Sequence, residues 1–292
     1  MRKFIRCMYG IGDALYTRPF LKYFAKKHSI YLDTALPEVF EDLPIKTVKP
    51  ARMPLRTQGK NVEKAKYHMQ EAPNMPKQHI HYGPNLQTSN IIDIIKSGFE
   101  ACFDEKMPTE EIKMELDFIK PIKESTKRPI AVVKPVTERK EWHNKARSPI
   151  PEYIETISEK LMEKYYVISL ADLKEGEEWL CQKRTYANKR YHKGEVSILE
   201  MISICAGADL VVGGVGNTVP IAMSCGKKAL VVCGGHGGYN HPERINNPYQ
   251  DCSNLTYMIP DNYHCCTDMQ CTKCDKIISD FEIKLNLFLE GL

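Results

Sequence analysis

A glycine-rich segment at residues 210–235 places the strongest constraint on the fold of this chain. It begins with an apolar run at 210–212 that lacks alternation, as a parallel strand buried on both faces should. Glycines follow at three of the next four positions, and Asn217 and Thr218 lie where a helix would begin. Residues 228–232 then predict a second parallel strand. The segment therefore indicates a strand–turn–helix–strand unit of an α/β sheet.

The turn in this segment is suited to a phosphate group. Glycine lets the backbone approach a ligand closely, and a helix N-terminus offers unpaired N–H groups and partial positive charge. In open α/β sheets, ligands bind beyond the carboxyl ends of the strands. The alternative is that the glycines only tighten a plain turn. We expect nucleotide or phosphate contacts from Gly213, Gly214, Gly216, Asn217 and Thr218.

The length and composition indicate a globular protein with two domains. The chain has 292 residues, of which 42% are hydrophobic, which suffices for two cores of about 100–200 residues each. No apolar run reaches about 18 residues, so no transmembrane helix is expected and any membrane association would be peripheral. The eleven cysteines are an odd number, and Cys7, Cys205, Cys225 and Cys233 lie singly in apolar elements. This usage is typical of a reduced, cytoplasmic protein.

Strand and helix patterns alternate in both halves of the chain. Expected strands cover residues 3–8, 30–32, 45–48, 130–134, 166–170, 210–212 and 228–232. Expected helices cover residues 14–27, 61–70, 91–103, 110–118, 151–164, 197–205 and 275–289, the fifth opened by Pro151 and the sixth capped by Ser197 and Glu200. Proline-bearing residues 119–129 form the expected linker between domains at 1–125 and 126–292. We therefore expect an α/β fold with two parallel sheets that face each other across a cleft.

Two further segments are informative when taken together. Residues 9–24 read Tyr-Gly-Ile-Gly-Asp-Ala-Leu-Tyr-Thr-Arg-Pro-Phe-Leu-Lys-Tyr-Phe, with a glycine–aspartate turn and a threonine–x–proline step. Residues 197–214 read Ser-Ile-Leu-Glu-Met-Ile-Ser-Ile-Cys-Ala-Gly-Ala-Asp-Leu-Val-Val-Gly-Gly. The two segments resemble the N-terminal signature and the donor segment of glycosyltransferase family 9, the heptosyltransferase-like enzymes. Residues 133–151 are similar to a family strand and basic loop before a helix. The resemblance covers most of the chain but is strong only near 4–24 and 195–235.

The resemblance implies the GT-B fold, in which two Rossmann-like domains bind acceptor and donor respectively. It implies an inverting transfer of a hexosyl or heptosyl group from a nucleotide-diphosphate sugar, with no cofactor required for catalysis and no metal at the diphosphate. The final helix would return toward the N-terminal domain. The chain departs from the family's donor motif at Val215, where an aspartate is usual, and at Pro220, where a histidine is usual. The donor therefore stays open, and His236, Tyr239, His241 or Arg244 could replace the missing contacts.

Asp13 matches the position of the family's base, which takes the proton of the acceptor hydroxyl as the anomeric carbon becomes oxocarbenium-like. Its alternative role is to cap the helix expected from Ala14. Further expected donor-site residues are Lys134, Arg139, Lys140 and His236, and Lys145 and Arg147 are additional candidates for charge at the leaving diphosphate. Expected acceptor contacts are Gly12, Arg18, Arg52 and Arg56.

Four cysteines gather near the end of the chain, within a Cys-rich segment at 252–274 that precedes the expected terminal helix at 275–290. Cys271 and Cys274 have the spacing of a zinc knuckle, and Cys265 and Cys266 could add a ligand. Cys252 or His264 could complete a tetrahedron. A structural zinc that pins the tail is one interpretation. The alternatives are an iron–sulfur cluster, a disulfide or free thiols.

Two basic clusters are relevant to the identity of the acceptor. Residues 46–77 hold eight lysines and arginines against Glu63 and Glu71, and residues 183–193 hold five cations and no acid. Such runs are often solvated faces, but they also suit an anionic partner. A lipopolysaccharide-like or other surface glycan fits the family, whereas a hydroxymethylated DNA base, gripped through phosphates and flipped, fits the basic clusters. A non-catalytic binder of nucleotide sugars is the third hypothesis, because Val215 and Pro220 depart from the donor motif.

Overall fold

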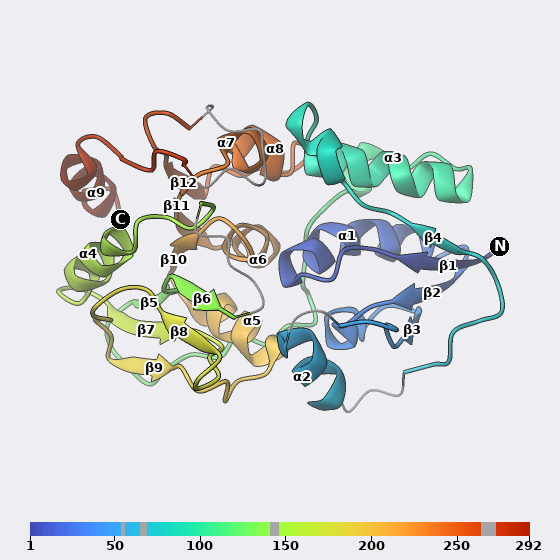
Figure 1. Cartoon of the computed structure of the whole chain (residues 1–292), viewed down its shortest axis with the longest axis horizontal. Coiled ribbons are helices and arrows are strands. Elements are labelled where there is room, and N and C mark those ends of the chain that lie inside the picture. Colours follow the sequence, from blue (N-terminus) through green and yellow to red (C-terminus); the bar gives the residue numbers. More distant parts are fainter. Residues whose placement is uncertain (54–55, 65–68, 141–145, 264–272) are drawn as a thin grey trace.

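The computed structural model describes residues 1–53, 56–64, 69–140, 146–263 and 273–292. Each half of the chain builds its own parallel sheet, and the two sheets lie side by side (Figure 1). The first half contains β1 (Arg2–Arg6), α1 (Ile11–Phe24), β2 (Ser29–Asp33), η1 (Pro37–Phe40), β3 (Lys46–Val48), α2 (Arg56–Lys64), β4 (Lys77–His79), η2 (Gly83–Gln87), α3 (Ile91–Phe103) and η3 (Thr109–Glu111). The expected α/β fold with two parallel sheets is confirmed.

The first sheet has the strand order β3-β2-β1-β4, with every pair parallel. Helices α1 and α3 pack against each other beside it, through fully buried aromatic rings. Phe20 and Phe24 stack on Phe99 with ring centroids 5.4 and 5.9 Å apart. Helix α3 spans the predicted residues because Asn90 caps it, accepting a hydrogen bond from the Ile92 N–H.

The second half holds a larger sheet with the strand order β12-β11-β10-β5-β7-β9, again parallel throughout. Its elements are β5 (Ile130–Val133), β6 (Thr137–Arg139), α4 (Pro151–Leu161), β7 (Tyr166–Leu170), β8 (Glu178–Leu180), β9 (Lys189–Tyr191), α5 (Ile198–Gly207), β10 (Leu210–Gly214), α6 (Thr218–Cys225), β11 (Lys228–Val232), α7 (Gly237–Asn240), α8 (Pro242–Ile245), β12 (Leu255–Met258) and α9 (Phe281–Glu290). Strands β6 and β8 form a separate antiparallel pair. The capping box predicted at Ser197 and Glu200 is confirmed at the start of α5.

The helix predicted over residues 110–118 is wrong. Only Thr109–Glu111 is helical, and the chain then runs without helix to the second half. Ile112, Met114 and Leu116 are buried while the residues between them are exposed. This alternation has the period of an extended segment, which buries one side of the chain.

Helix α9 does not return to the first half, so that expectation from the family resemblance is also wrong. It begins at Phe281 rather than near residue 275 and packs on α4 (Figure 1). The rings of Phe281 and Tyr153 stack with centroids 4.2 Å apart, Leu285 is fully buried, and Lys160 pairs with Glu282 at 2.7 Å. Because the buried residues of α9 pack within the second half, the helix stays on that half and does not extend to the first.

Within the described ranges, no helix is both long and apolar enough to pass through a bilayer. The cysteines in those ranges are free thiols. Burial raises the pKa of the Cys7 and Cys233 thiols to about 12, so these two behave as small apolar core residues.

Candidate active site

The predicted glycine turn lies between β10 and the start of α6, at the carboxyl end of the sheet's central strands. A Cβ on Gly213 would lie 2.7 Å from the Thr218 Oγ1, so this position requires glycine for close packing. Gly216 has φ +152°, a conformation that side chains rarely adopt, and faces open space. Asn217 then caps α6 without using its side chain for the cap. The cap therefore does not use the Asn217 amide, and the start of α6 has the unpaired N–H groups of a helix N-terminus.

The N-terminus of α1 approaches this turn from the first half. A Cβ on Gly12 would lie 3.3 Å from Pro220 Cγ and 3.6 Å from the Gly216 carbonyl oxygen. Helices α1 and α6 pack against each other at this point, near the middle of the molecule (Figure 1). Gly12 is thus one of the contacts between the two halves, and it packs on the glycine turn one residue before Asp13.

Asp13 occupies the third position of α1, which begins at Ile11 rather than at Ala14. Its Oδ2 accepts a hydrogen bond from the Gly10 N–H at 3.0 Å, as in the reciprocal half of a capping box. Its Oδ1 accepts from the Tyr82 hydroxyl at 2.6 Å. Burial, reinforced by the Asp13 carboxylate, raises the pKa of Tyr82 well above its ordinary value, so Tyr82 keeps its proton. The cap and the candidate base are therefore the same carboxylate.

Lys134, one of the predicted donor-site cations, packs against the glycine turn. Lys134 follows β5, and its backbone N–H donates a hydrogen bond to the Val212 carbonyl. Its Cβ lies 3.1 Å from the position that a Cβ on Gly213 would occupy. Burial lowers the pKa of its ammonium. Among the described residues, no carboxylate lies within ion-pair distance of Lys134; its Nζ is 3.6 Å from the Met201 sulfur. A bound anion would favour the charged form of this amine.

Arg147 precedes α4. Burial raises the pKa of Tyr82 and of Tyr263, and the positive charge of Arg147 opposes that rise at both. Its backbone carbonyl packs against Gly234, where a Cβ would lie 2.2 Å from the oxygen. The glycines after β11 are therefore explained by close packing of the chain.

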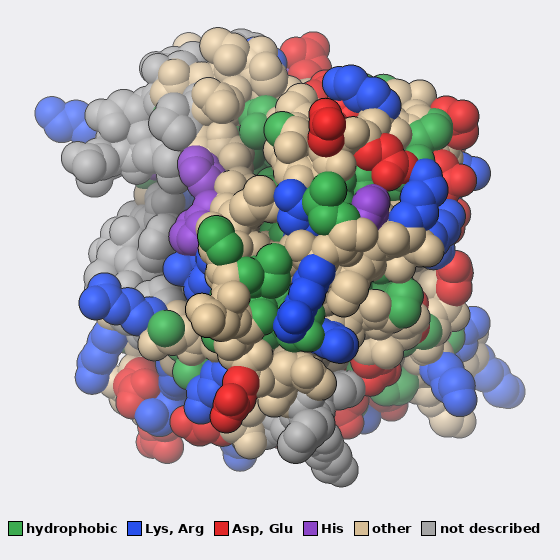
Figure 2. Space-filling view, turned by 90° about the vertical axis from the view of Figure 1, so that its right-hand side faces the viewer, with side chains coloured by type: hydrophobic (Ala, Val, Ile, Leu, Met, Phe, Trp, Pro, Cys, Tyr) green, Lys and Arg blue, Asp and Glu red, His purple; other side chains and the backbone are tan. Residues whose placement is uncertain are grey.

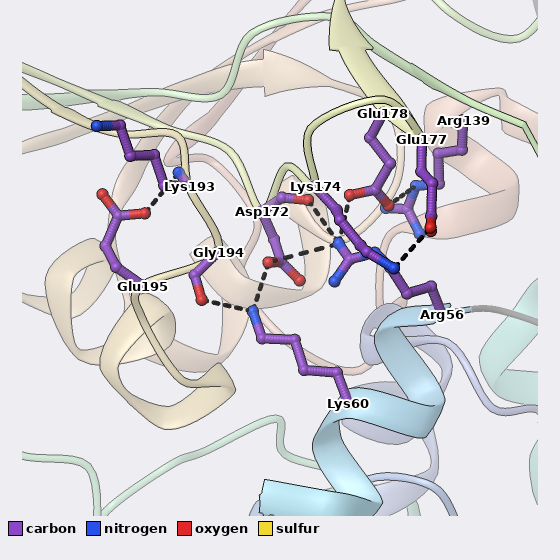
Figure 3. A network of polar contacts seen from close by, with 10 residues as sticks. All are labelled: Arg56, Lys60, Arg139, Asp172, Lys174, Glu177, Glu178, Lys193, Gly194 and Glu195. Carbon is purple, nitrogen blue, oxygen red and sulfur yellow. Dashed lines mark hydrogen bonds and ion pairs between the residues drawn. The ribbon is translucent and has the colours of Figure 1, made fainter.

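Arg56 and Arg139 take part in an ionic network that joins the two halves (Figure 3). Arg56 pairs with Glu178, whose side chain is 1% exposed, and lies 3.7 Å from Asp172. Arg139 lies 3.5 Å from Glu178 on the other side. Lys60, one turn after Arg56 on α2, donates to Asp172 at 2.6 Å and to the Gly194 carbonyl at 2.7 Å. The placement favours a structural role for both arginines.

The remaining predicted residues lie in varied surroundings. Arg18 is buried, donates to the Val39 and Glu115 carbonyls and pairs with Asp42, so its placement also favours a structural role. Arg52 and Lys140 are exposed. His236 is buried and has a left-handed backbone conformation with φ +60°. Its backbone N–H donates to the Cys274 sulfur at 3.4 Å.

The predicted metal ligands Cys265, Cys266 and Cys271 lie outside the described residues, as do Lys145 and His264. Cys274 is described, and it packs against Gly235, where a Cβ would lie 2.3 Å from the Cys274 Cβ. In the part of the chain that the structure covers, no three His, Cys, Asp or Glu side chains gather to hold a metal. The metal site stays a prediction.

Tyr82, Lys60 and Glu178 were missed by reasoning from the sequence. Tyr82 precedes a Gly-Pro pair and carries no charge, which is the pattern of an ordinary turn. Lys60 belongs to the first basic cluster, and nothing in the sequence distinguishes it from the other lysines and arginines there. A buried glutamate such as Glu178 can be recognised only once its arginine partners are placed.

No protein-family model and no curated protein matches this chain. Solved structures do match. The iron-containing dodecameric glycosyltransferase TibC from enterotoxigenic E. coli matches with TM-score 0.60 and 12% identity, over 99% of this chain and 77% of that one. A family 9 glycosyltransferase from Veillonella parvula matches with TM-score 0.57 and 14% identity, over 99% and 96%. E. coli ADP-heptose lipopolysaccharide heptosyltransferase II matches with TM-score 0.55 and 13% identity, over 99% and 100%.

This chain has the fold of the heptosyltransferases. The resemblance to glycosyltransferase family 9 is thereby confirmed at the level of the fold, and the GT-B arrangement of the two sheets with it. In that arrangement, the junction of α1 and α6 lies between the two sheets, with Asp13 contributed by one half and the glycine turn by the other.

Proposed function

We propose that this protein transfers a sugar from a nucleotide-diphosphate sugar to a hydroxyl group of an acceptor. The observation that carries the proposal is the close packing of Gly12, the neighbour of Asp13, on the glycine turn at Gly213–Thr218, where α1 contacts α6. A base and a phosphate-binding turn on opposite sides of one junction are what a direct displacement at an anomeric carbon requires.

In the proposed reaction, Asp13 takes the proton of the acceptor hydroxyl while that oxygen attacks the anomeric carbon. The bond to the nucleoside diphosphate breaks on the opposite face, so the configuration inverts. The developing negative charge on the diphosphate is stabilised by the N–H groups at the start of α6. Lys134, which packs on Gly213, supplies positive charge, and Arg147 is the second candidate for that charge. Asn217 contacts the nucleotide through its amide, which the helix cap leaves available.

The similar structures support an adenine nucleotide as the first donor to test. TibC has been solved with ADP-D-beta-D-heptose, and the E. coli heptosyltransferase WaaC with ADP. We therefore propose an ADP-sugar donor, although Val215 and Pro220 distinguish this chain from the family's donor motif.

For the acceptor we propose an anionic glycan rather than DNA. Several cations of the basic clusters that favoured DNA make contacts within the chain. Lys46 donates to the Tyr31 hydroxyl. Lys77 pairs with Asp33 at 2.5 Å, and Lys189 pairs with Glu124 at 2.7 Å. On the end face of the first half, Lys and Arg side chains are intermingled with Asp and Glu around the margins (Figure 2). A mobility-shift assay with duplex DNA at low salt separates the two acceptors, because phosphate contacts bind most tightly there.

The proposal is tested with a thermal-shift panel of ADP-, UDP-, GDP- and CMP-sugars, followed by transfer assays with the donor that stabilises the protein. We expect stabilisation by one nucleotide class, weakened in Asn217→Ala but not in Asn286→Ala, which alters an exposed residue on α9. Asp13→Asn should keep donor binding and lose transfer about 10²–10⁴-fold. Donor binding with no transfer by the wild type to any glycan would instead support the non-catalytic binder, and no stabilisation by any donor would contradict the proposal.

A further inference from the structure

The carboxylate of Asp13 is held by two donors that come from different parts of the first half. Gly10, at the cap of α1, donates its N–H to Oδ2 at 3.0 Å. Tyr82, which follows β4, donates its hydroxyl to Oδ1 at 2.6 Å. The torsion that orients a carboxylate has a broad minimum, so a single donor would leave its plane poorly fixed. One donor on each oxygen defines that plane and directs the remaining lone pairs.

Tyr82 is itself fixed by its surroundings. The next residue, Gly83, has φ +38°, a turn that favours glycine. The η2 helix that follows packs on α7 of the second half, where the Gln87 amide donates to the Tyr239 hydroxyl. Tyr82 is therefore anchored to the loop that follows β11 as well as to its own sheet. Because its pKa is raised by burial, it stays protonated and acts as a donor.

We propose that Tyr82 is a positioning residue for Asp13, and that its hydroxyl orients the carboxylate for proton transfer from the acceptor. The inference rests on the proposed function. In that reaction the base must lie within hydrogen-bond reach of the acceptor hydroxyl and point toward it, and small misplacements of reacting groups cost large factors in rate. Removing the Tyr82 hydroxyl frees one carboxylate oxygen and leaves the ring packing in place.

Tyr16 supplies a matched control on the same helix as Asp13. Tyr16 is buried, whereas Tyr82 is partly buried, and the Tyr16 hydroxyl also donates a 2.6 Å hydrogen bond, but to the Ile245 carbonyl. Tyr16→Phe therefore removes a tyrosine hydroxyl whose hydrogen bond joins the two halves and does not involve Asp13. A loss of activity specific to Tyr82→Phe would not come from weaker packing of the halves.

The experiment measures transfer kinetics in the wild type, Tyr82→Phe, Tyr16→Phe, Asp13→Ala and the double variant Tyr82→Phe/Asp13→Ala. We expect Tyr82→Phe to lower kcat about 10–100-fold, with the KM for the donor within about twofold and an unchanged unfolding midpoint. Tyr16→Phe should keep nearly full kcat. In the Asp13→Ala background, removing the Tyr82 hydroxyl should have no further effect, because residues that act through each other are not additive.

The possible results of these measurements distinguish failure of the inference from failure of the proposed function. Wild-type kcat in Tyr82→Phe, an equal loss in Tyr16→Phe, or a Tyr82→Phe effect that persists unchanged without Asp13 would overturn the inference while leaving the proposed function standing. A wild-type protein that transfers no sugar would instead overturn the proposed function, and this inference with it. A loss confined to the donor KM would assign Tyr82 to donor binding and contradict a positioning role.

Discussion

The ionic network between α2 and the second half makes a quantitative prediction about stability. Arg56 reaches from α2 to Glu178 on β8, and the Glu178 side chain is 1% exposed while that of Arg56 is 16% exposed. Arg56→Met removes the charge and keeps most of the aliphatic stem. The change leaves Glu178 with Arg139, which lies farther away at 3.5 Å and is 29% exposed. We expect Arg56→Met to destabilise the protein and to weaken the contact between its halves.

The magnitude follows from the burial of the carboxylate. Removing one partner of a fully buried pair costs about 3–5 kcal/mol, mainly because the other charge stays buried. Arg139 still compensates part of the Glu178 charge, and water reaches Arg56, so we expect about 2–3 kcal/mol here. With an m-value of about 2–3 kcal/mol/M, this lowers the urea midpoint by about 1 M.

The assay is equilibrium urea unfolding of Arg56→Met beside Lys174→Met as a matched control. Lys174 lies in the same region (Figure 3) and pairs with Glu177, with side chains 53% and 36% exposed, so its removal should cost about 0–1 kcal/mol. Arg56→Met/Glu178→Leu should recover most of the loss, since no buried charge remains unpaired. If Arg56→Met costs no more than Lys174→Met, the reasoning from burial is refuted.

Other predictions concern pH, capping and metal. Burial raises the pKa of Glu38 to about 7 from its ordinary 4.5, so the folded chain binds a proton that the unfolded chain has lost. Unfolding free energy should then fall by about 2–3 kcal/mol as pH rises from 4.5 to 7, and Glu38→Gln should flatten that fall in urea titrations at pH 5 and 7.5. Ser197→Ala, which removes the α5 cap, should cost about 1 kcal/mol in the same assay, against a near-neutral Ser253→Ala. Elemental analysis should find about one zinc or iron per chain, lost in Cys271→Ser and Cys274→Ser and kept in Cys102→Ser; a metal-free wild type contradicts the sequence prediction. Iron is measured beside zinc because the cysteine spacing also allows an iron–sulfur cluster.

Much of the fold could be predicted because its central elements carry strong local signals. The strands β5, β7, β10 and β11 are apolar runs, as buried parallel strands must be. The strands that escaped prediction, such as β4 and β9, are three residues long and polar. They lie at sheet edges, where pairing depends on the register of the neighbouring strand rather than on the residues themselves.

The residues of the candidate site also differ in how far they could be predicted from the sequence. Asp13 and the glycine turn could be predicted, because each belongs to a contiguous pattern of turn and helix start. Tyr82 is 69 residues from Asp13 along the chain, and Glu178 is 122 residues from Arg56. The first contact follows from the pairing of β4 with β1 within one sheet, and the second from how the two halves are placed, so neither partner could be assigned from its local sequence.

Pro220 explains physically why this chain departs from the donor motif of the family it resembles. Proline is tolerated there because the first turn of a helix leaves its N–H groups unpaired, and Pro220 is the third residue of α6. It is buried and is the nearest neighbour that a Cβ on Gly12 would meet, at 3.3 Å. The position where a histidine is usual is thus used for packing α6 on α1. In the proposed reaction, the donor is therefore contacted by groups around the turn that packing does not use, of which Asn217 and Lys134 are the candidates.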